Sequence, residues 1–371
     1  MRAVSSFIAT ASISAVAIWL LACAGKPANE PTILAGADTA GREAQTGSLD
    51  PRLQALDAGG LIPLPYRGPG SGGVAYRLTL EVEGERAARN SSSNKQQPPI
   101  REMHTLEAEF RKLPVEGGNS GADMFLVGLD GLIYTHKQKN PPAERKTELA
   151  DDRLRIMING ETSIDNRGER VTGPLAPRMF LNRIFGVITH DPSGNPKMLS
   201  SRGPPAARQF MDEIPILGAI AYTMVSLPQQ PIAAGSSWTG VRVPPSRSGE
   251  LGLSFTVNYS LAGFEIFEDV PCAMILLNAQ IRENGFTSLT GLVFDRVQAT
   301  LNGTAWVELE NSIVRRVVLS DQIRASWAYP GDPKMAAKGR IEHTSKLVLA
   351  LRDPRRRSKK WSDGTPRFDS K

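Results

Sequence analysis

The chain has 371 residues, of which 40% are hydrophobic and 22% are charged, a balance typical of a globular body of one large or two modest domains. It contains only two cysteines, Cys23 and Cys272, which excludes a small scaffold held together by several disulfides. The formal net charge is +6, and residues 352–371 alone hold eight Lys and Arg against three Asp and Glu. The rest of the chain is therefore almost neutral, and the basic character belongs to the C-terminal end.

The N-terminus has the parts of a secretory signal. Arg2 supplies a positive charge, and residues 7–22 follow without a charged side chain. This run is shorter than the roughly 20 residues that a membrane-spanning helix needs. We therefore expect residues 1–22 to be a signal peptide, with an uncleaved anchor as the alternative.

The apolar run ends in the tetrapeptide Leu20-Leu21-Ala22-Cys23, which resembles the lipobox of bacterial lipoproteins. The resemblance implies cleavage before Cys23 and acylation of Cys23, so that acyl chains hold the protein in a membrane of the cell envelope. Two or three chains give stable attachment, whereas one binds marginally. Because residue 24 is Ala rather than Asp, the resemblance favours the outer membrane, with the body on its periplasmic or surface face. An ordinary signal cleavage site near Cys23 is the alternative.

Residues 23–73 are rich in Gly, Ala and Pro, which predicts a lipidated flexible tether. A coil of about 50 residues reaches on the order of 40 Å, so the body would stay near the bilayer without lying on it. Within this segment, residues 53–61 alone indicate a short helix or a docking patch.

Residues 74–200 are predicted as an N-terminal β-rich half, because apolar and polar residues alternate as they do in half-buried strands. Asp130-Gly131 is typical of a tight hairpin turn, and residues 84–99 are predicted as a polar loop. The predicted strands cover residues 74–83, 106–113, 124–129, 132–135, 154–159 and 162–171.

The middle of the chain differs from the β-rich halves. Residues 177–185 fit either a short helix that begins at Pro177 or a strand. Residues 205–225 predict a helix broken near Pro215, and the second part is apolar all round, which indicates burial. This part is either a core helix packed on a sheet or a lid over an apolar cavity. The residues assigned to the lid or core are Ile216, Leu217, Ile220, Tyr222, Met224 and Trp238.

Residues 201–351 are predicted as this helix followed by a C-terminal β-rich half. Asn311-Ser312 marks a hairpin, and Cys272 is expected to be a buried thiol in a core strand. The strands are predicted at residues 251–261, 272–282, 291–303, 304–310, 313–327 and 340–351. The predicted fold class is α+β, mainly β, with two antiparallel meander sheets and a few central covering helices.

A second pattern runs from Leu227 to Trp238, with prolines at 228 and 231 and a glycine at 235. It resembles a Leu-Pro-x-x-Pro…Gly-x-x-Trp stretch in uncharacterised families of secreted β-rich bacterial lipoproteins, which have no established activity. The prolines would stiffen a crossover, Gly235 would allow a tight turn, and Trp238 would anchor the segment in the core. A Trp238 that stacks on carbohydrate is the alternative.

The sequence lacks the spacings that mark common catalytic and metal sites. His104, His136, His190 and His343 are far apart and do not place two ligands on one helix face, so we interpret them as scattered surface or strand residues. No Gly-x-Ser-x-Gly elbow is present, and residues 191–195 lack the later acidic ligand of a calcium loop. We expect no metal, no cofactor and no enzymatic activity.

Residues 352–371 are predicted as a disordered basic tail, because they are polar and lack any apolar period. Such a tail either is simply solvated or contacts anionic lipid or envelope polymer, with each Lys or Arg near the surface contributing about 1 kcal/mol. Export argues against nucleic acid as a partner. The residues assigned to a surface contact are Arg355, Arg356, Arg357, Lys359, Lys360 and Trp361.

These observations predict a non-enzymatic envelope lipoprotein, anchored through Cys23, whose body binds an apolar ligand or a protein partner. In outline the layout resembles periplasmic carriers with a curved sheet covered by helices. A structural or assembly lipoprotein that acts through protein contacts is one alternative. A hydrolase of envelope polymers is the other.

Overall fold

The structure is a computed structural model of the chain. It describes residues 53, 60–66, 73–90, 98–113, 115, 124–150, 152–167, 172–173, 175–181, 184–214, 216–242, 255–283, 286–287, 293–329 and 337–352. The predicted signal peptide, Cys23 and the basic cluster of residues 355–361 lie outside these ranges.

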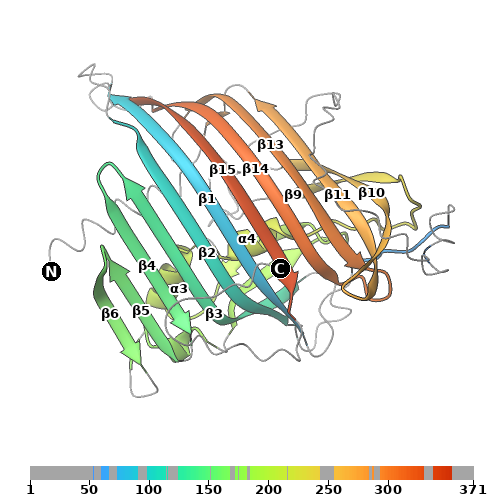
Figure 1. Cartoon of the computed structure of the whole chain (residues 1–371), viewed down its shortest axis with the longest axis horizontal. Helices are drawn as coiled ribbons and strands as arrows, with labels where there is room; N and C mark the ends of the chain where they lie inside the picture. Colours follow the sequence, from blue (N-terminus) through green and yellow to red (C-terminus); the bar gives the residue numbers. More distant parts are fainter. Residues whose placement is uncertain are drawn as a thin grey trace.

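In the described part, strands dominate and helices are few (Figure 1). Two short α-helices lie in the middle of the chain, α3 at Pro205–Asp212 and α4 at Ile216–Tyr222, together with a 3-10 turn at Pro177–Met179. The strands are β1 Val74–Asn90, β2 Ile100–Leu113, β3 Met124–Lys139, β4 Ala143–Ala150, β5 Arg153–Ile158, β6 Glu161–Arg167, β7 Ile184–His190, β8 Pro196–Ser201, β9 Ser237–Arg242, β10 Phe255–Phe267, β11 Val270–Glu283, β12 Phe286–Thr287, β13 Val293–Glu308, β14 Val314–Tyr329 and β15 Ala337–Leu351.

All of these strands belong to one 15-stranded sheet, whose main path has the order β6-β5-β4-β3-β2-β1-β15-β14-β13-β11-β10-β9. Off this path, β12 pairs with β13, and the β7–β8 hairpin branches from the first part of β3. The prediction of two separate sheets was wrong, because β1 pairs with β15 along its whole length as well as with β2. Figure 1 shows this junction as the cyan strand beside the red one. The pairing is antiparallel throughout, as the predicted meanders require.

The alternation that predicted the strands also separates the two faces of the sheet. We call the inner face the one that carries Leu78, with its cross-strand neighbours Ala108 on β2 and Leu349 on β15. These three residues are at most 1% exposed. The outer face carries mostly charged and polar residues, such as Glu81 opposite Lys346, so one face is apolar and the other meets water.

The Asp130-Gly131 dipeptide does not form the predicted hairpin turn. It lies within the single strand β3, and residues 126–139 all pair with the same partner, β2, apart from a bulge opposite Glu109 and Phe110. The bulge shifts the side-chain alternation of β3 by one residue. The inner-face positions are therefore odd-numbered up to Leu129 and even-numbered from Leu132. Likewise the two strands predicted at 291–310 are one continuous strand, β13.

Other predicted elements are confirmed. The helix at 205–225 is broken near Pro215 into α3 and α4, and Asn311-Ser312 lies in the turn between β13 and β14. Ser312 has φ 53°, a left-handed conformation that such turns need. Cys272 is buried in β11, and burial raises the pKa of its thiol to about 12, so the thiol is inert.

A second layer packs against the inner face. It consists of the β7–β8 hairpin, α3, α4, residues 60–66 and residues 223–236, which we call the crossing segment because it joins α4 to β9 at the far edge of the sheet. Ile62 and Leu64, inside the predicted tether, are buried, and Ile62 bridges to Ile232 of the crossing segment. Among the helices that the structure describes, none is long and apolar enough to cross a membrane.

Gly235 and Trp238 of the Leu227–Trp238 pattern contact the sheet, with Trp238 partly buried against the core. Gly235 has φ +83° and its amide donates to the Leu261 carbonyl oxygen, so the tight turn reaches β10. The Trp238 ring stacks on Tyr259 at 5.8 Å between ring centroids, and its indole Nε1–H donates to the Ser226 carbonyl at 3.0 Å. The crossing segment is thus fixed to the sheet at its distal end.

The outer face holds a charge network that ties the end of β15 to β2 and β3. Glu109 is 4% exposed and pairs with Arg77 at 2.7 Å and with Arg352 at 3.0 Å. Arg352 also approaches Asp130 at 3.6 Å, and its amide donates to the Ala75 carbonyl. The start of the predicted C-terminal tail is therefore part of the sheet.

Glu107, on the same face, gives a pH-dependent prediction. Burial raises its pKa from 4.5 to about 7, against the opposing effect of Arg77. A raised pKa means that the folded state binds the Glu107 proton more tightly than the unfolded state does. The protonated carboxyl therefore stabilises the folded state at pH values below 4.5, and this stabilisation is lost as the pH rises through about 7. Glu107→Gln should therefore raise the free energy of unfolding by about 1 kcal/mol at pH 8, allowing for solvent screening, and by nothing at pH 4. Urea unfolding at both pH values measures this, and an equal effect at both would contradict it.

Candidate functional site

The inner face is apolar across nearly the whole width of the sheet. On the strands of the C-terminal half, this face includes several small residues. One is Gly303 on β13, which lies between Leu277 of β11 and Leu319 of β14. Only a few polar side chains interrupt it among the described residues, chiefly Glu102, His104, Lys112 and Asp321. The buried apolar residues on β11, β13, β14 and β15 are Ala273, Ile275, Leu277, Ala279, Val297, Ala299, Leu301, Ala305, Val307, Val317, Leu319, Ile323, Ala325, Leu347 and Leu349.

Helix α4 is held against this face by a polar clamp. The Tyr222 hydroxyl, at the end of α4, donates to Asp321 Oδ2 on β14 at 2.9 Å, and the Ser345 hydroxyl on β15 donates to the same oxygen at 2.7 Å. The carboxylate is partly buried within an apolar face, where it needs such donors. The clamp fixes the position of Tyr222 above β13 and β14.

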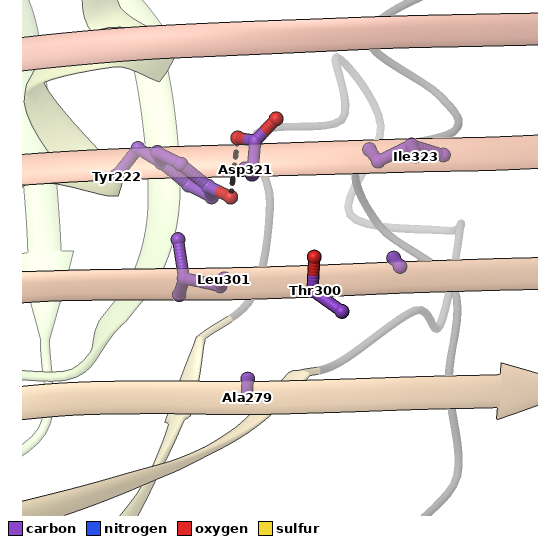
Figure 2. Close-up of a pocket in the computed structure, with 7 residues that line it drawn as sticks. Tyr222, Ala279, Thr300, Leu301, Asp321 and Ile323 are labelled. Carbon is purple, nitrogen blue, oxygen red and sulfur yellow. Dashed lines mark hydrogen bonds between the residues drawn. The ribbon is translucent and has the colours of Figure 1, made fainter. Parts of the chain in front are cut away.

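A hollow lies beside this clamp (Figure 2). It holds about 190 Å³ of empty space, part of it open to solvent, between Tyr222 and the strands β11, β13 and β14. Its lining is Tyr222, Ala279, Ala299, Thr300, Leu301, Asp321 and Ile323. The alanines at 279 and 299, diagonal neighbours on β11 and β13, leave the space that larger side chains would fill.

The residues predicted as lid or core divide into a buried group and a partly buried group. Ile216, Ile220 and Met224 are at most 2% exposed and belong to the main core. Leu217 and Tyr222 are partly buried: Leu217 packs against Gly186 of β7, where a Cβ atom would lie 2.4 Å from it, and Tyr222 borders the hollow. The helix is therefore core along most of its length and a wall of the hollow at its C-terminal end.

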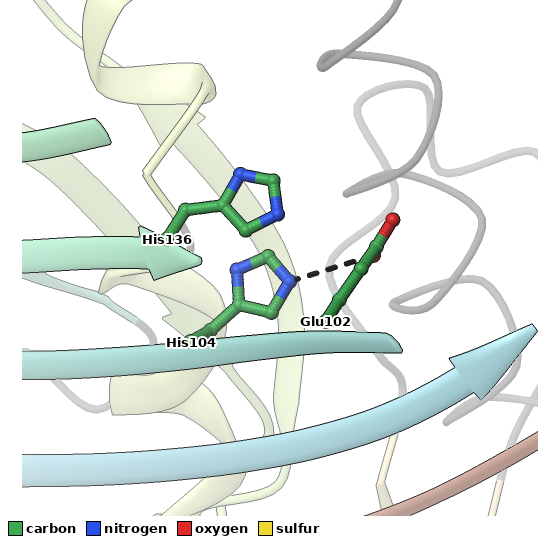
Figure 3. A group of neighbouring side chains, drawn as sticks. All are labelled: Glu102, His104 and His136. Carbon is green, nitrogen blue, oxygen red and sulfur yellow. Dashed lines mark ion pairs between the residues drawn. The ribbon is translucent and has the colours of Figure 1, made fainter. Parts of the chain in front are cut away.

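A polar cluster lies at the end of the inner face formed by β2 and β3 (Figure 3). Glu102 and His104 are two residues apart on β2 and so point to the same face, and His136 lies directly opposite His104 on β3. The two imidazole rings are stacked, with centroids 4.3 Å apart and planes within 4°. The nearest ligand atoms of the three side chains all lie within 4.8 Å of one another.

The surroundings of the cluster lower the pKa of His136 and orient the His104 ring. Glu102 is 5% exposed and His104 is 6% exposed, and Nε2 of His104 lies 3.7 Å from a Glu102 oxygen. Nδ1 of His104 is 2.8 Å from the Tyr134 hydroxyl, which fixes the ring. Burial, aided by His104, lowers the pKa of His136 to about 4. In the described part of the chain, neither histidine Nε2 has a hydrogen-bond partner.

The interpretation of the histidines as scattered residues was wrong for His104 and His136. The spacings that place two ligands on one helix face do not apply to these side chains, because they lie on strands. On a strand, residues i and i+2 share a face, and here the third side chain comes from the paired strand. The signal in the sequence was Glu102-x-His104 within an alternating segment. His136 had no such signal, because its position opposite His104 depends on the bulge in β3.

The other two histidines lie elsewhere. His190 is 1% exposed, contacts the Tyr66 ring at 4.6 Å, and its Nδ1 lies 2.9 Å from the Asp191 carbonyl, so it is a core residue. His343 lies in β15 opposite Gly84, and its side chain is not described. The Asp191 carboxylate accepts hydrogen bonds from the amides of Ser193 and Asn195 in its own loop, which occupies it structurally.

Lys112 is the other unexpected polar residue of the inner face. It is 8% exposed, at the opposite end of β2 from the cluster, and its ammonium lies over the rings of Tyr76 and Phe125 at 5.1 and 4.9 Å. These cation–π contacts offset part of the cost of burial. Burial still lowers the pKa of Lys112 to about 8. Nothing in its sequence context distinguishes it from a surface lysine.

Comparisons with known proteins assign no family to the chain and find only distant structural similarity. No family model and no curated protein matches the chain. Solved structures of low similarity include lipovitellin, from work on lipid–protein interactions, at 10% identity and TM-score 0.38, with 77% of this chain covered. The match spans 25% of the lipovitellin chain. The translocator domain of the autotransporter NalP from Neisseria meningitidis matches at 8% identity and TM-score 0.22, over 81% of this chain and 94% of that one.

The clamp on α4 gives a stability prediction. Tyr222→Phe removes one donor to Asp321 and should lower the free energy of unfolding by about 1 to 2 kcal/mol, because the acceptor is a carboxylate in an apolar setting. Urea unfolding measures the loss. Gln322→Ala, on the exposed side of the same strand, is the control and should change stability by less than about 0.5 kcal/mol. Equal effects of the two substitutions would show that the clamp contributes nothing.

Proposed function

We propose that this protein is a lipid-anchored envelope protein whose body binds an apolar ligand, an acyl chain, on the inner face of its sheet. The observation that carries the proposal is the continuous apolar inner face, which has a hollow beside the Tyr222 clamp. The helices pack chiefly on β8, β7 and β1, so they leave the hollow at their margin.

The size of the hollow limits what it holds. The hollow is shallow, because its 190 Å³ includes space open to solvent and the side chains leave no enclosed room for a water molecule. An acyl chain would therefore lie along the apolar inner face beside Tyr222, with the segments that cover this face displaced. The lining supplies mainly apolar contact, with the Tyr222–Asp321 pair at its edge as a polar group for orientation.

The anchor supports the same role. Acyl chains on Cys23 would keep the body close to a bilayer, which is the source of apolar ligands in an envelope. The polar outer face suits a body that stays in water at the end of its tether. Binding and anchoring together describe a carrier or sensor of lipid rather than an enzyme.

The binding claim predicts the effect of filling the hollow. Ala299→Phe should weaken binding of a fluorescent fatty acid at least tenfold, because the new ring occupies the space beside Leu301. Gln298→Phe is the matched control, since Gln298 lies on the same strand but is exposed on the outer face. Fluorescence titration of the purified, delipidated full-length chain measures both. Equal affinity of Ala299→Phe and wild type, with both folded by circular dichroism, would contradict the proposed site.

The anchoring claim predicts the effect of removing the acylated thiol. Cys23→Ser should release the protein into the soluble fraction or leave a longer, unprocessed precursor, because serine does not take up the thioether-linked lipid. Fractionation of the bacterial envelope followed by intact mass measurement distinguishes the two forms. A Cys23→Ser protein that remains in the membrane at the mature mass would show that Cys23 is not the anchor.

A further inference from the structure

We propose that Glu102, His104 and His136 form a binding site for a divalent transition-metal ion, with two imidazole nitrogens and one carboxylate oxygen as ligands. The site is separate from the hollow and does not depend on the proposed lipid binding. It rests on the side-chain positions shown in Figure 3.

The ligand atoms of the three side chains lie close to one another. Nε2 of His104 faces a Glu102 oxygen at 3.7 Å, and no hydrogen bond satisfies this nitrogen or Nε2 of His136 among the described residues. Two buried imidazole nitrogens that lack a hydrogen-bond donor are costly. A cation that binds both nitrogens and the neighbouring carboxylate oxygen removes that cost.

The second argument is the fixed backbone beneath the ligands. All three come from the interior of the paired strands β2 and β3 rather than from loops, which gives a rigid platform. Their ligand atoms lie within 4.8 Å of one another. Ligands about 2.0–2.1 Å from a tetrahedral Zn²⁺ lie about 3.3 Å apart. Small side-chain rotations therefore bring the three to bonding distance.

The third argument is the surroundings of the ligands. The Tyr134 hydroxyl lies 2.8 Å from Nδ1 of His104, so a proton on Nδ1 leaves the Nε2 lone pair directed toward Glu102. Ligating histidines usually have such a partner at the other nitrogen. Arg145 lies opposite His136 on β4, and Glu213 forms an ion pair with it at 2.9 Å.

The ligand set narrows the class of ion. Two imidazoles and a carboxylate suit Zn²⁺, Fe²⁺, Ni²⁺ or Cu²⁺ and disfavour Ca²⁺ and Mg²⁺, which prefer oxygen ligands throughout. Three protein ligands leave at least one coordination position for water or for another donor. The site therefore differs from the closed four-ligand sites that serve structure alone.

The test is titration of the untagged, chelator-treated, full-length chain with Zn²⁺ by calorimetry, and with Co²⁺ by visible absorption. The wild type should bind one equivalent saturably, and the Co²⁺ complex should develop ligand-field bands. Glu102→Gln, which keeps the shape of the side chain, should weaken Zn²⁺ binding at least tenfold, and His136→Asn should weaken it further. Tyr134→Phe should weaken it about tenfold through loss of the hydrogen bond to His104.

Glu107→Gln is the matched control, because it removes a carboxylate from the opposite face of the same strand and should leave Zn²⁺ affinity unchanged. Thermal melts without metal establish that each variant is folded, and Zn²⁺ should raise the melting temperature of the wild type and of Glu107→Gln equally and that of the other variants by less. Absence of a saturable one-equivalent site in the wild type would overturn the proposal. So would folded Glu102→Gln and His136→Asn proteins that bind Zn²⁺ as the wild type does.

Discussion

The pairing of β1 with β15 is the interaction on which the rest of the structure depends. It joins the first strand of the N-terminal half to the last strand of the C-terminal half, over fifteen residue pairs from Tyr76–Leu351 to Asn90–Ala337. On its inner side it places Leu78 against Leu349 and Leu80 against Leu347, all at most 4% exposed. Two half-meanders thereby become one sheet with one continuous apolar face.

A sheet of this width has a large apolar face. A face with so many apolar side chains must be shielded from water, and the second layer of α3, α4, the β7–β8 hairpin and the crossing segment packs against it. The crossing segment reaches the far edge because Trp238 and Gly235 fix it to β9 and β10. The hollow beside Tyr222 lies at the margin of this cover, and for that reason we place the ligand there.

The few polar residues of the inner face are therefore informative. Asp321 holds α4 through Tyr222, and Lys112 lies between aromatic rings, so each has a local partner that stabilises it. Glu102, His104 and His136 differ, because they face one another. The proposed acyl-chain surface and the proposed metal site are two separate features of the same face.

Much of the fold could be predicted from the sequence, because alternation over long strands gives their direction and their buried side. The break at Pro215, the turn at Asn311-Ser312 and the anchoring by Trp238 followed from local chemistry. The single sheet did not, since the pairing of β1 with β15 joins residues far apart in the sequence. The bulge at Asp130-Gly131 was mistaken for a turn for the same reason: only the partner β2 shows that the strand continues.

The His104–His136 pair depends on that same register and could not be read from spacing along one strand. The hollow likewise depends on the strand register that makes Ala279 and Ala299 diagonal neighbours on the inner face, so neither alanine carries a signal individually. Cys23 and the basic cluster at residues 355–361, the strongest functional signals in the sequence, lie outside the described residues. Sequence and structure thus inform different parts of the proposed function.

The most direct test of apolar-ligand binding is photo-crosslinking with a fatty acid that carries a diazirine on its acyl chain, followed by mass-spectrometric mapping of the labelled peptides. The account predicts labels on inner-face residues of β13 and β14 around Leu301 and Ile323, competed away by unlabelled fatty acid. Labels confined to outer-face residues such as Gln298 and Gln322, or labelling that unlabelled fatty acid does not reduce, would contradict it.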